Sequence, residues 1–394
     1  MHFISNALNS FYSLIWFWSK SNRFQYQRER VLPMKNRFQT TAENILDHAR
    51  WAPSGDNMQT WRFEIVDTHC FIVHGYDTRD HCVYDLEGHA SQLAIGALLE
   101  SIAIAASAFK CRAEFQLDEN ALETKPTINV QLIEDKNIEQ DPLFLYLPKR
   151  SVQRRMLKTT PLSLKDKSKL EQSVGNFYNI KWIEGWRARL QAAFLMYKNG
   201  RLRLILPEAF PTHSTIIEWN SRFSDDKIPD QAVGLDMVAM RMMRWAMKSW
   251  KRVSFLNTFL AGTLLPRIEL DLLPGIACAA HFSLVAEKEP RTMEDYLNAG
   301  RAVQRFWLTS TMLGLQLQPE MTPLIFSGYI KNKVEFTKTQ KIHDYAVDLS
   351  KVFKRLMGGE AVIDKAVFVG RIGYGKPAKA RSLRLSLEQL EYKR

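Results

Sequence analysis

The sequence predicts an α+β fold in which helices predominate and the strands are short and spread along the chain. Two observations support this class. Long segments show the 3.6-residue apolar spacing of helices, and the segments that alternate are short and do not form a regular βαβ series. The 394 residues are 46% hydrophobic and 24% charged, which are globular proportions. Such a composition excludes a wholly disordered chain, a collagen-like repeat and a coiled-coil rod, and the length predicts two or three structural units.

The first series of elements begins near residue 40. It comprises a helix at 42–51, strands at 61–66 and 71–75, a long apolar helix at 92–109 and a strand at 127–133. Asp67 and Thr68 form a turn signal between the two strands, which predicts a hairpin. Glu100, Ser101 and Ser107 interrupt the apolar helix. We therefore interpret it as a buried core or interface helix in preference to a membrane span.

A second series follows in the remainder of the chain. It comprises helices at 190–206 and 237–260, a strand at 282–286, a long apolar helix at 300–315 and a strand at 366–370. The two apolar helices share the pattern G-x-A-x-Q, at 88–92 and 300–304. This echo predicts a duplicated unit whose central helices pack together.

The net charge of +12 is concentrated at the two ends of the sequence. Residues 1–37 carry +5 and residues 365–394 carry +6, so the body between them is nearly neutral. A nucleic-acid-binding face across the body is therefore not expected, and local anion sites near the ends are favoured. The four cysteines are scattered without a C-x-x-C pair. This pattern disfavours a disulfide scaffold or structural zinc and favours a cytoplasmic protein.

Residues 1–37 form an aromatic and basic arm that allows two interpretations. Residues 1–19 are rich in aromatic side chains, and the apolar run at 11–18 is far shorter than the ~20 residues of a spanning helix. The arm either packs on the domain or, with the basic residues at 20–37, anchors the chain at a membrane surface. A peripheral membrane contact through residues 11–37 is thus one expectation.

The segment A-P-S-G-D-N-M-Q-T-W at 52–61 lies between a predicted helix and a predicted strand. Pro53 fixes a turn and Gly55 permits a close backbone approach. Ser54, Asn57 and Gln59 then present polar groups within a few residues. The loop suits a ligand with hydroxyl and amide edges, although an ordinary helix-to-strand turn would also explain it.

Two basic segments could bind phosphate. K-R-S-V-Q-R-R at 149–155 places a hydroxyl between arginines spaced by four, and K-A-R-S-L-R at 379–384 follows a glycine-containing turn. Guanidinium groups and a hydroxyl can converge on one phosphate, while solvated surface charge is the alternative. The acidic and histidine residues between 74 and 89 match no metal-binding spacing, so turn capping and ion pairing are expected there and no metal is predicted.

The combination of these segments resembles the FMN-dependent nitroreductase family. Residues 44–63 are similar to its helix and A-P-S loop, 150–155 to its Arg-Ser segment, 314–320 to its loop over the flavin, and 371–388 to its C-terminal basic segment. Thr60 stands in the place of the usual proline, and Gln153 lengthens the Arg-Ser segment. The resemblance implies FMN as cofactor and NAD(P)H as electron donor. It further implies ping-pong hydride transfer through flavin N5, with no catalytic side chain required, to a nitroaromatic, quinone or enone.

The A-P-S loop occurs only in the first half of the chain, and the Arg-Ser and P-E segments are convincing only in the second. We therefore predict a fused pseudo-dimer with one flavin site per chain, able to act as a monomer. Its parts are the arm at 1–37, a first unit at 38–148, and a second unit at 149–394 with a helical insertion at 213–271. The insertion forms either a lid and substrate wall or extra packing helices. The alternative function is an FMN-binding or storage protein without turnover, or the flavin partner of another enzyme.

The resemblance assigns roles to individual residues. Arg150, Ser151, Arg154, Arg381 and Arg384 are expected at the phosphate; Pro53, Ser54, Gly55, Asn57 and Gln59 along the ribityl chain and ring; Arg154 or Arg155 at the pyrimidine edge; and Pro319 and Glu320 at the ring from the other half. His281, within an apolar run, is expected to be a hydrogen-bonded core or flavin-edge histidine.

Overall fold

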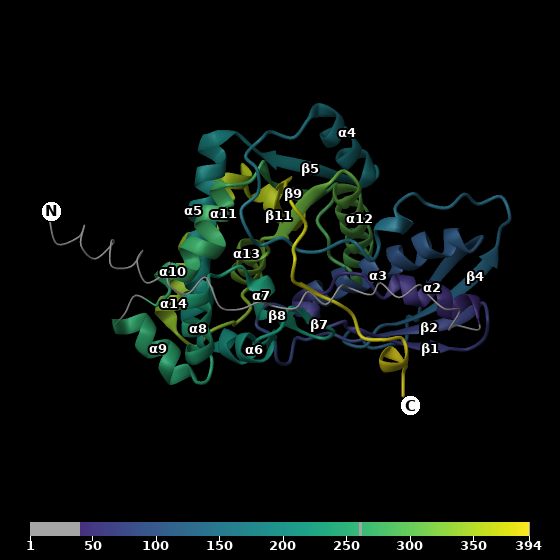
Figure 1. Cartoon of the computed structure of the whole chain (residues 1–394), viewed down its shortest axis with the longest axis horizontal. Helices are drawn as coiled ribbons and strands as arrows, with labels where there is room; N and C mark the ends of the chain where they lie inside the picture. The colour runs from purple at the N-terminus through teal and green to yellow at the C-terminus, as the bar shows by residue number, and fades with distance from the viewer. Residues whose placement is uncertain (1–39, 260–261, 394) are drawn as a thin grey trace, which may run out of the picture. The chain divides into compact units, whose positions relative to one another are not determined.

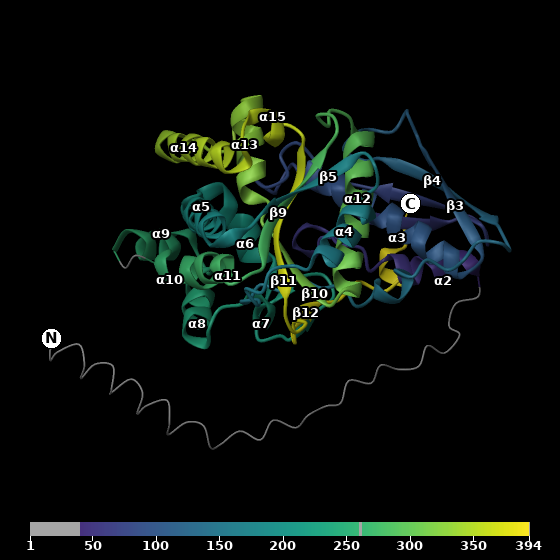
Figure 2. The same cartoon turned by 90° about the horizontal axis from the view of Figure 1, so that it is seen from above.

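The computed structural model describes residues 40–259 and 262–393, which belong to one compact unit beginning at Thr40. The arm predicted for residues 1–37, with its membrane contact, lies outside the described residues. Figures 1 and 2 show two antiparallel sheets, each accompanied by a long helix, with further helices gathered beside the second sheet.

The first half contains the elements α2 (Thr41–Ala49), β1 (Trp61–Ile65), β2 (Cys70–Gly75), α3 (His89–Ala108), β3 (Cys111–Leu117) and β4 (Thr127–Glu134). A capping box between Thr40 and Glu43 begins α2. The strands form an antiparallel sheet in the order β1-β2-β4-β3. The predicted hairpin is confirmed as β1 and β2. Strand β3 was not predicted, because its alternating side chains include Arg112, Glu114 and Gln116, which dilute the apolar signal.

The second half repeats this plan around two long insertions. Its elements are α4 (Leu164–Ser173), β5 (Tyr178–Ile183), β9 (Ala280–Ala286), α12 (Met293–Met312), β10 (Leu315–Pro319) and β11 (Ala366–Tyr374). The strands form an antiparallel sheet in the order β5-β9-β11-β10. Both halves therefore run helix, strand, strand, long helix, strand, strand, with the same strand order in each sheet.

The two long helices α3 and α12 cross at a pair of glycines. A Cβ added at Gly96 would lie 2.0 Å from the carbonyl oxygen of Leu297, and one added at Gly300 would lie 2.1 Å from that of Leu93. The contact is reciprocal. In each helix the glycine lies three residues after the leucine, and each glycine meets the leucine carbonyl of the other helix. Gly96 is thus the counterpart of Gly300. The echo in the sequence paired Gly88 with Gly300, which is wrong: Gly88 lies one residue before α3, at φ 76°.

The first long helix, α3, is long and apolar enough to cross a membrane by length and composition. Its most apolar window, however, is 83% buried inside the protein. The interpretation as a core helix is confirmed, and the apolar surface is covered by α12 and the first sheet. The predicted helix at 300–315 needs correction, because α12 begins at Met293, after the N-cap Thr292, and ends at Met312, and Leu315 already starts β10.

The insertion between β5 and β9 is mainly helical. It contains α5 (Gly185–Ile205), α6 (Phe210–Thr215), the short strands β6 (Ile217–Glu218), β7 (Phe223–Ser224) and β8 (Ile228–Pro229), then α7 (Asp230–Val233), α8 (Met237–Ala246), α9 (Trp250–Phe259), α10 (Leu264–Arg267), a π-helical turn (Ile268–Leu272) and α11 (Leu273–Ile276). The single helix predicted at 237–260 is wrong. The chain turns after Ala246, so that Ala246, Val253 and Leu256 of the two helices share one small apolar core.

The second insertion lies between β10 and β11 and contains α13 (Thr322–Asn332), α14 (Gln340–Met357) and α15 (Glu360–Ile363). Helices α13, α14 and α5 surround a core that includes Phe326, Phe336 and Phe353. After β11 the chain passes through β12 (Arg381–Ser382), which pairs in parallel with β7 of the first insertion. This pairing brings the C-terminal basic segment back to the A-P-S loop.

Candidate functional site

A cavity of about 470 Å³ lies where the A-P-S loop, α3, α12, the end of β10 and the C-terminal segment meet. This volume is within the usual range for small-molecule sites. The predicted site residues that line it are Pro53, Ser54, Gly55, Asn57, Arg150, Ser151, Arg154, Pro319, Glu320, Arg381 and Arg384. Gln59 and Arg155 do not line it. Segments more than 300 residues apart in sequence therefore meet at one cavity.

The A-P-S loop has an unusual backbone at this cavity. Asp56, Asn57 and Gln59 all have positive φ angles, of 49°, 66° and 49°. Each such residue costs of order 1 kcal/mol or more, so surrounding contacts must hold the loop in place. The Ser54 hydroxyl accepts a hydrogen bond from the Gln59 N–H at 2.9 Å, and the Asn57 amide donates to the Asp225 carbonyl at 3.0 Å. The insertion therefore helps to fix the loop.

Gln59 supports this loop from behind instead of facing the cavity. Its side chain is fully buried. Its amide nitrogen donates to the Asp225 carbonyl at 2.9 Å, and its amide oxygen accepts from the Leu385 N–H at 2.9 Å. Backbone groups of the insertion and of the C-terminal segment thus occupy both ends of its amide, and a contact between Gln59 and a ligand stays a prediction.

Three arginines from two distant segments converge at one end of the cavity. Arg150 donates to the Trp51 carbonyl at 3.1 Å, and its guanidinium lies 4.5 Å from the ring centre of Trp307. Arg384 donates twice to the Ala52 carbonyl, at 2.9 and 2.8 Å. Arg381 belongs to β12 in the same segment and also lines the cavity. Arg150 and Arg384 are both buried.

The electrostatics of this cluster are unfavourable without an anion. Burial, followed by the charges of Arg384 and Arg381, holds the pKa of Arg150 well below its usual range. Burial and the neighbouring Arg381 and Arg50 lower the pKa of Arg384 to about 9. Among the described residues, no carboxylate forms an ion pair with Arg150 or Arg384. The buried Nε of Arg150 also has no hydrogen-bond partner within that part of the chain. Such a cluster is suited to a phosphate or another multiply charged anion.

Arg154 and Arg155 differ in their position. Arg154 lines the cavity and donates to the Ala232 carbonyl at 3.2 Å. Burial lowers its pKa to about 10, although Asp56 opposes this shift. Arg155 is exposed and donates to the Gln231 carbonyl at 3.1 Å, so only Arg154 of the two neighbours can face a ligand there.

Glu320 lies in a buried ion-pair network at the cavity wall. Its carboxylate contacts His281 Nδ1 at 2.6 Å and accepts from Arg371 at 2.8 Å. His281 Nε2 lies 2.8 Å from the Gly275 carbonyl, so both ring nitrogens have partners. Burial opposes the charged forms of His281 and Glu320. Glu320 nevertheless raises the pKa of His281 to about 10, and His281 and Arg371 lower the pKa of Glu320 to about 2. Glu320 therefore fixes its neighbours, and its carboxylate is not free for a ligand.

A second polar group also lines the cavity and comes mostly from the first insertion. The Tyr84 hydroxyl lies 2.8 Å from His213 Nε2, and Arg203 pairs with Asp271 at 2.7 Å. Burial, with the charge of Arg203, lowers the pKa of His213 to about 4, so His213 is neutral near pH 7. The sequence analysis did not select these side chains, because no local motif joins positions separated by 129 residues, as in the Tyr84–His213 contact, or by 68, as in the Arg203–Asp271 pair. The insertion at 213–271 thus contributes a wall of the cavity.

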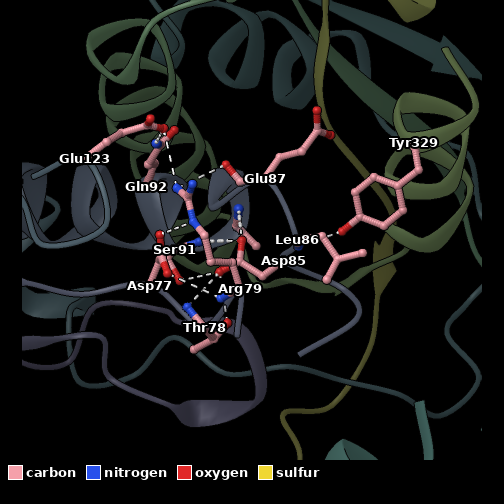
Figure 3. A network of polar contacts seen from close by, with 11 residues as sticks. Asp77, Thr78, Arg79, Asp85, Leu86, Glu87, Ser91, Gln92, Glu123 and Tyr329 are labelled. Carbon is pink, nitrogen blue, oxygen red and sulfur yellow. Dashed lines mark hydrogen bonds and ion pairs between the residues drawn. The ribbon is translucent and has the colours of Figure 1, made fainter. Parts of the chain in front are cut away.

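Within the segment 74–89, Asp77 and Asp85 hold a turn before α3 through hydrogen bonds and an ion pair (Figure 3). Asp85 accepts hydrogen bonds from the N–H groups of Ala90 and Ser91 and from the Thr78 hydroxyl. Asp77 pairs with Arg79. The predicted capping and ion pairing are present. Over the described ranges 40–259 and 262–393, no group of three or more His, Cys, Asp or Glu could hold a metal ion.

Comparisons with solved structures find distant likeness to this chain. No protein-family model matches the chain, and no curated protein matches it. A crystal structure of a nitroreductase-like family protein from Bacillus cereus matches 64% of this chain and 96% of its own chain, at 12% identity and a TM-score of 0.32. At this level of likeness, the neighbour alone supports no inference about function.

Proposed function

We propose that the chain is an FMN-dependent oxidoreductase that reduces a small-molecule acceptor with NAD(P)H. The observation that carries this proposal is the cluster at one end of the cavity, beside the A-P-S loop, where the buried Arg150 and Arg384 lie with the half-buried Arg381. Arg150 and Arg384 form no ion pair with a carboxylate among the described residues, and a bound anion would offset the cost of burying their charges. The cavity continues from this cluster between apolar side chains of α3 and α12, which include Leu93, Ala97 and Trp307. This arrangement would suit a ligand that has a phosphate at one end and an aromatic ring system beyond it, as FMN does.

We further infer that the chain is a fused pseudo-dimer with one such site. The repeated strand order and the reciprocal crossing at Gly96 and Gly300 support the duplication. The residue of α12 that corresponds to Ala97 is Arg301, which pairs with Glu100 at 2.9 Å, and Arg305 pairs with the same carboxylate at 2.7 Å. Charged side chains thus fill the second, equivalent position, where an apolar wall would be needed. A single chain would then suffice for one complete site.

The residues present fit FMN in type and placement. Arg150, Arg381 and Arg384 would hold its phosphate, and the unpaired Nε of Arg150 would gain a partner. The A-P-S loop would lie along the ribityl chain, and Arg154 would lie near the more polar part of the ring. When bound, FMN supplies hydride transfer between NAD(P)H and the acceptor. The chain itself binds and orients, and its apolar walls keep water from the reacting surface.

The acceptor side of the site would be formed by the first insertion. Ile216, Ile217, Ile228 and Leu270 give this wall its apolar character, with His213 neutral among them. Such a wall suits an uncharged and largely apolar acceptor, such as a nitroaromatic, a quinone or an enone. Nothing in this wall favours a nucleic acid. A cytoplasmic location remains a prediction from the cysteine pattern.

The test is whether the purified protein holds FMN and whether reduced nicotinamide bleaches it. We expect one FMN per chain after incubation and desalting, and loss of flavin absorbance on rapid mixing with NADH or NADPH. A desalted protein without flavin absorbance would contradict the proposal. Bound flavin that neither nicotinamide bleaches would instead support the storage or partner role.

A further inference from the structure

Helices α8 and α9 expose a surface that the rest of the described unit does not cover. We define the outer face of α8–α9 by Met237, Val238, Arg241, Trp245, Lys248 and Lys251, all of which are exposed. Met237 is 77% exposed, Val238 67% and Trp245 44%. The members of this face on α8 recur every three to four residues, so they lie on one side of the helix. Figures 1 and 2 show both helices at the periphery, away from both sheets.

The same helices pack inward through a separate set of apolar residues. Met242, Met243, Ala246, Val253 and Leu256 line a chamber of about 150 Å³ that shares Arg203 and His213 with the main cavity. On this inner side, Ala246, Val253 and Leu256 also pack together as a small apolar core. The apolar side chains on the outer face contribute nothing to this core, and their exposure to water carries a cost.

The charge of this segment has a single sign. Between Met237 and Arg267 the sequence contains six basic residues and no Asp or Glu. Within the described part of the chain, Arg241, Lys248 and Lys251 form no ion pair. Such a local concentration of positive charge, interleaved with Trp and Met, differs from the nearly neutral body of the protein.

We propose that the outer face of α8–α9 docks on an anionic lipid bilayer. Amphipathic helices that mix Lys and Arg with Trp and aliphatic side chains bind in the interface between headgroups and acyl chains. The exposed Met237, Val238 and Trp245 would enter that interface, while Arg241, Lys248 and Lys251 would contact lipid phosphates. A nucleic acid would use the charge but would leave Met237 and Val238 in water, so a bilayer fits the whole face better. This surface is distinct from residues 11–37.

The test is co-sedimentation of the full chain with lipid vesicles. Vesicles of equimolar phosphatidylglycerol and phosphatidylcholine are compared with vesicles of phosphatidylcholine alone. One variant combines Arg241→Gln, Lys248→Gln and Lys251→Gln, and a second carries Trp245→Ala. The control combines Lys136→Gln, Lys165→Gln and Lys169→Gln, which removes the same charge from exposed positions on α4 and after β4.

We expect the wild type to bind anionic vesicles and not phosphatidylcholine. Each lysine or arginine near an anionic surface contributes about 1 kcal/mol, so the triple variant should partition on the order of a hundredfold less. Trp245→Ala should also weaken binding, and the control should bind within a factor of about three of the wild type. The proposal is overturned if the wild type ignores anionic vesicles, if the triple variant binds like the wild type, or if Trp245→Ala has no effect. Flavin content does not enter this measurement, so its result is independent of the proposed redox function.

Discussion

The arginine cluster makes Arg150→Met the sharpest test of the anion site. The substitution keeps an unbranched apolar side chain but removes the guanidinium, and with it the charge over the Trp307 ring and the donor to the Trp51 carbonyl. A charge-assisted hydrogen bond to phosphate contributes about 1.5–3 kcal/mol, so the dissociation constant for FMN should rise roughly 10- to 150-fold. The free protein should keep its stability or gain some, because the loss of one backbone hydrogen bond is offset by relief of repulsion from Arg384 and Arg381.

Thermal unfolding with and without FMN measures both effects. At a ligand concentration of 100 times the wild-type dissociation constant, binding adds about 2.7 kcal/mol to stability. For a unit of about 355 residues, an unfolding entropy of ~2.1 cal/mol/K per residue converts this into a rise in Tm of roughly 4 °C. At the same concentration, a variant that binds 100-fold more weakly gains only ~0.4 kcal/mol, which is a rise of less than about 1 °C.

Arg155→Met is the matched control, because Arg155 adjoins the same segment but is exposed and does not line the cavity. We expect it to show the full ligand-induced rise in Tm. The reasoning is refuted if Arg150→Met retains the wild-type rise, or if Arg155→Met loses it equally. A large fall in the Tm of ligand-free Arg150→Met would also refute the inference that the cluster is destabilising without an anion.

Four further predictions concern the support of the site and of the fold around it. Glu320→Gln should lower the free energy of unfolding by about 3–5 kcal/mol, measured by urea denaturation, because it leaves His281 charged and unpaired; unchanged stability would contradict the buried pair. In the wild type, the stabilisation from His281 should be complete below pH ~6.5 and should decline as the pH rises through about 10. The stabilisation from Glu320 should be complete above pH ~4.5 and should disappear as the pH falls through about 2. Gly96→Ala should destabilise by more than about 2 kcal/mol, since its Cβ meets a backbone carbonyl, whereas Gly328→Ala within α13 should be neutral or stabilising; equal effects would count against the tight crossing. Gln59→Ala should cost about 2–3 kcal/mol and weaken FMN binding, because the Leu385 N–H loses its partner; normal binding would show that the loop does not need this support.

The sequence allowed most of the local elements of the site to be predicted. Turn chemistry made the loop at Pro53 a candidate, and local charge made the segments of Arg150 and Arg384 candidates, because such signals depend on neighbours in sequence. Only the family resemblance assigned these segments to one site. The same local signals placed β1, β2 and α3 close to their observed bounds. Contacts between distant segments left no such signal. Nothing near Gln59 shows that its amide will be used by Asp225 and Leu385.

The sequence did not predict which residues of α3 and α12 correspond to each other, for a similar reason. G-x-A-x-Q matches letters at the start of each helix, whereas the structural equivalence is set by backbone contact between α3 and α12. Only a glycine lets the carbonyl of the other helix approach so closely, and this makes Gly96 the partner of Gly300. A one-letter match cannot distinguish a glycine at a helix start, such as Gly88, from a glycine at a crossing.

The C-terminal segment shows why the first insertion matters to the anion site. Repulsion among the arginines should push this segment away from Arg150, so other contacts must hold it. The N–H of Arg381 donates to the Arg222 carbonyl at 3.1 Å, and the N–H of Leu383 donates to the Ser224 carbonyl at 2.7 Å. Both acceptors lie in or beside β7, so the insertion fixes the position of Arg384 and, through the Asp225 carbonyl, also fixes the A-P-S loop. A chain with β7 disrupted should therefore lose anion binding even with every arginine present, because the binding geometry depends on a backbone pairing and not on the charges alone.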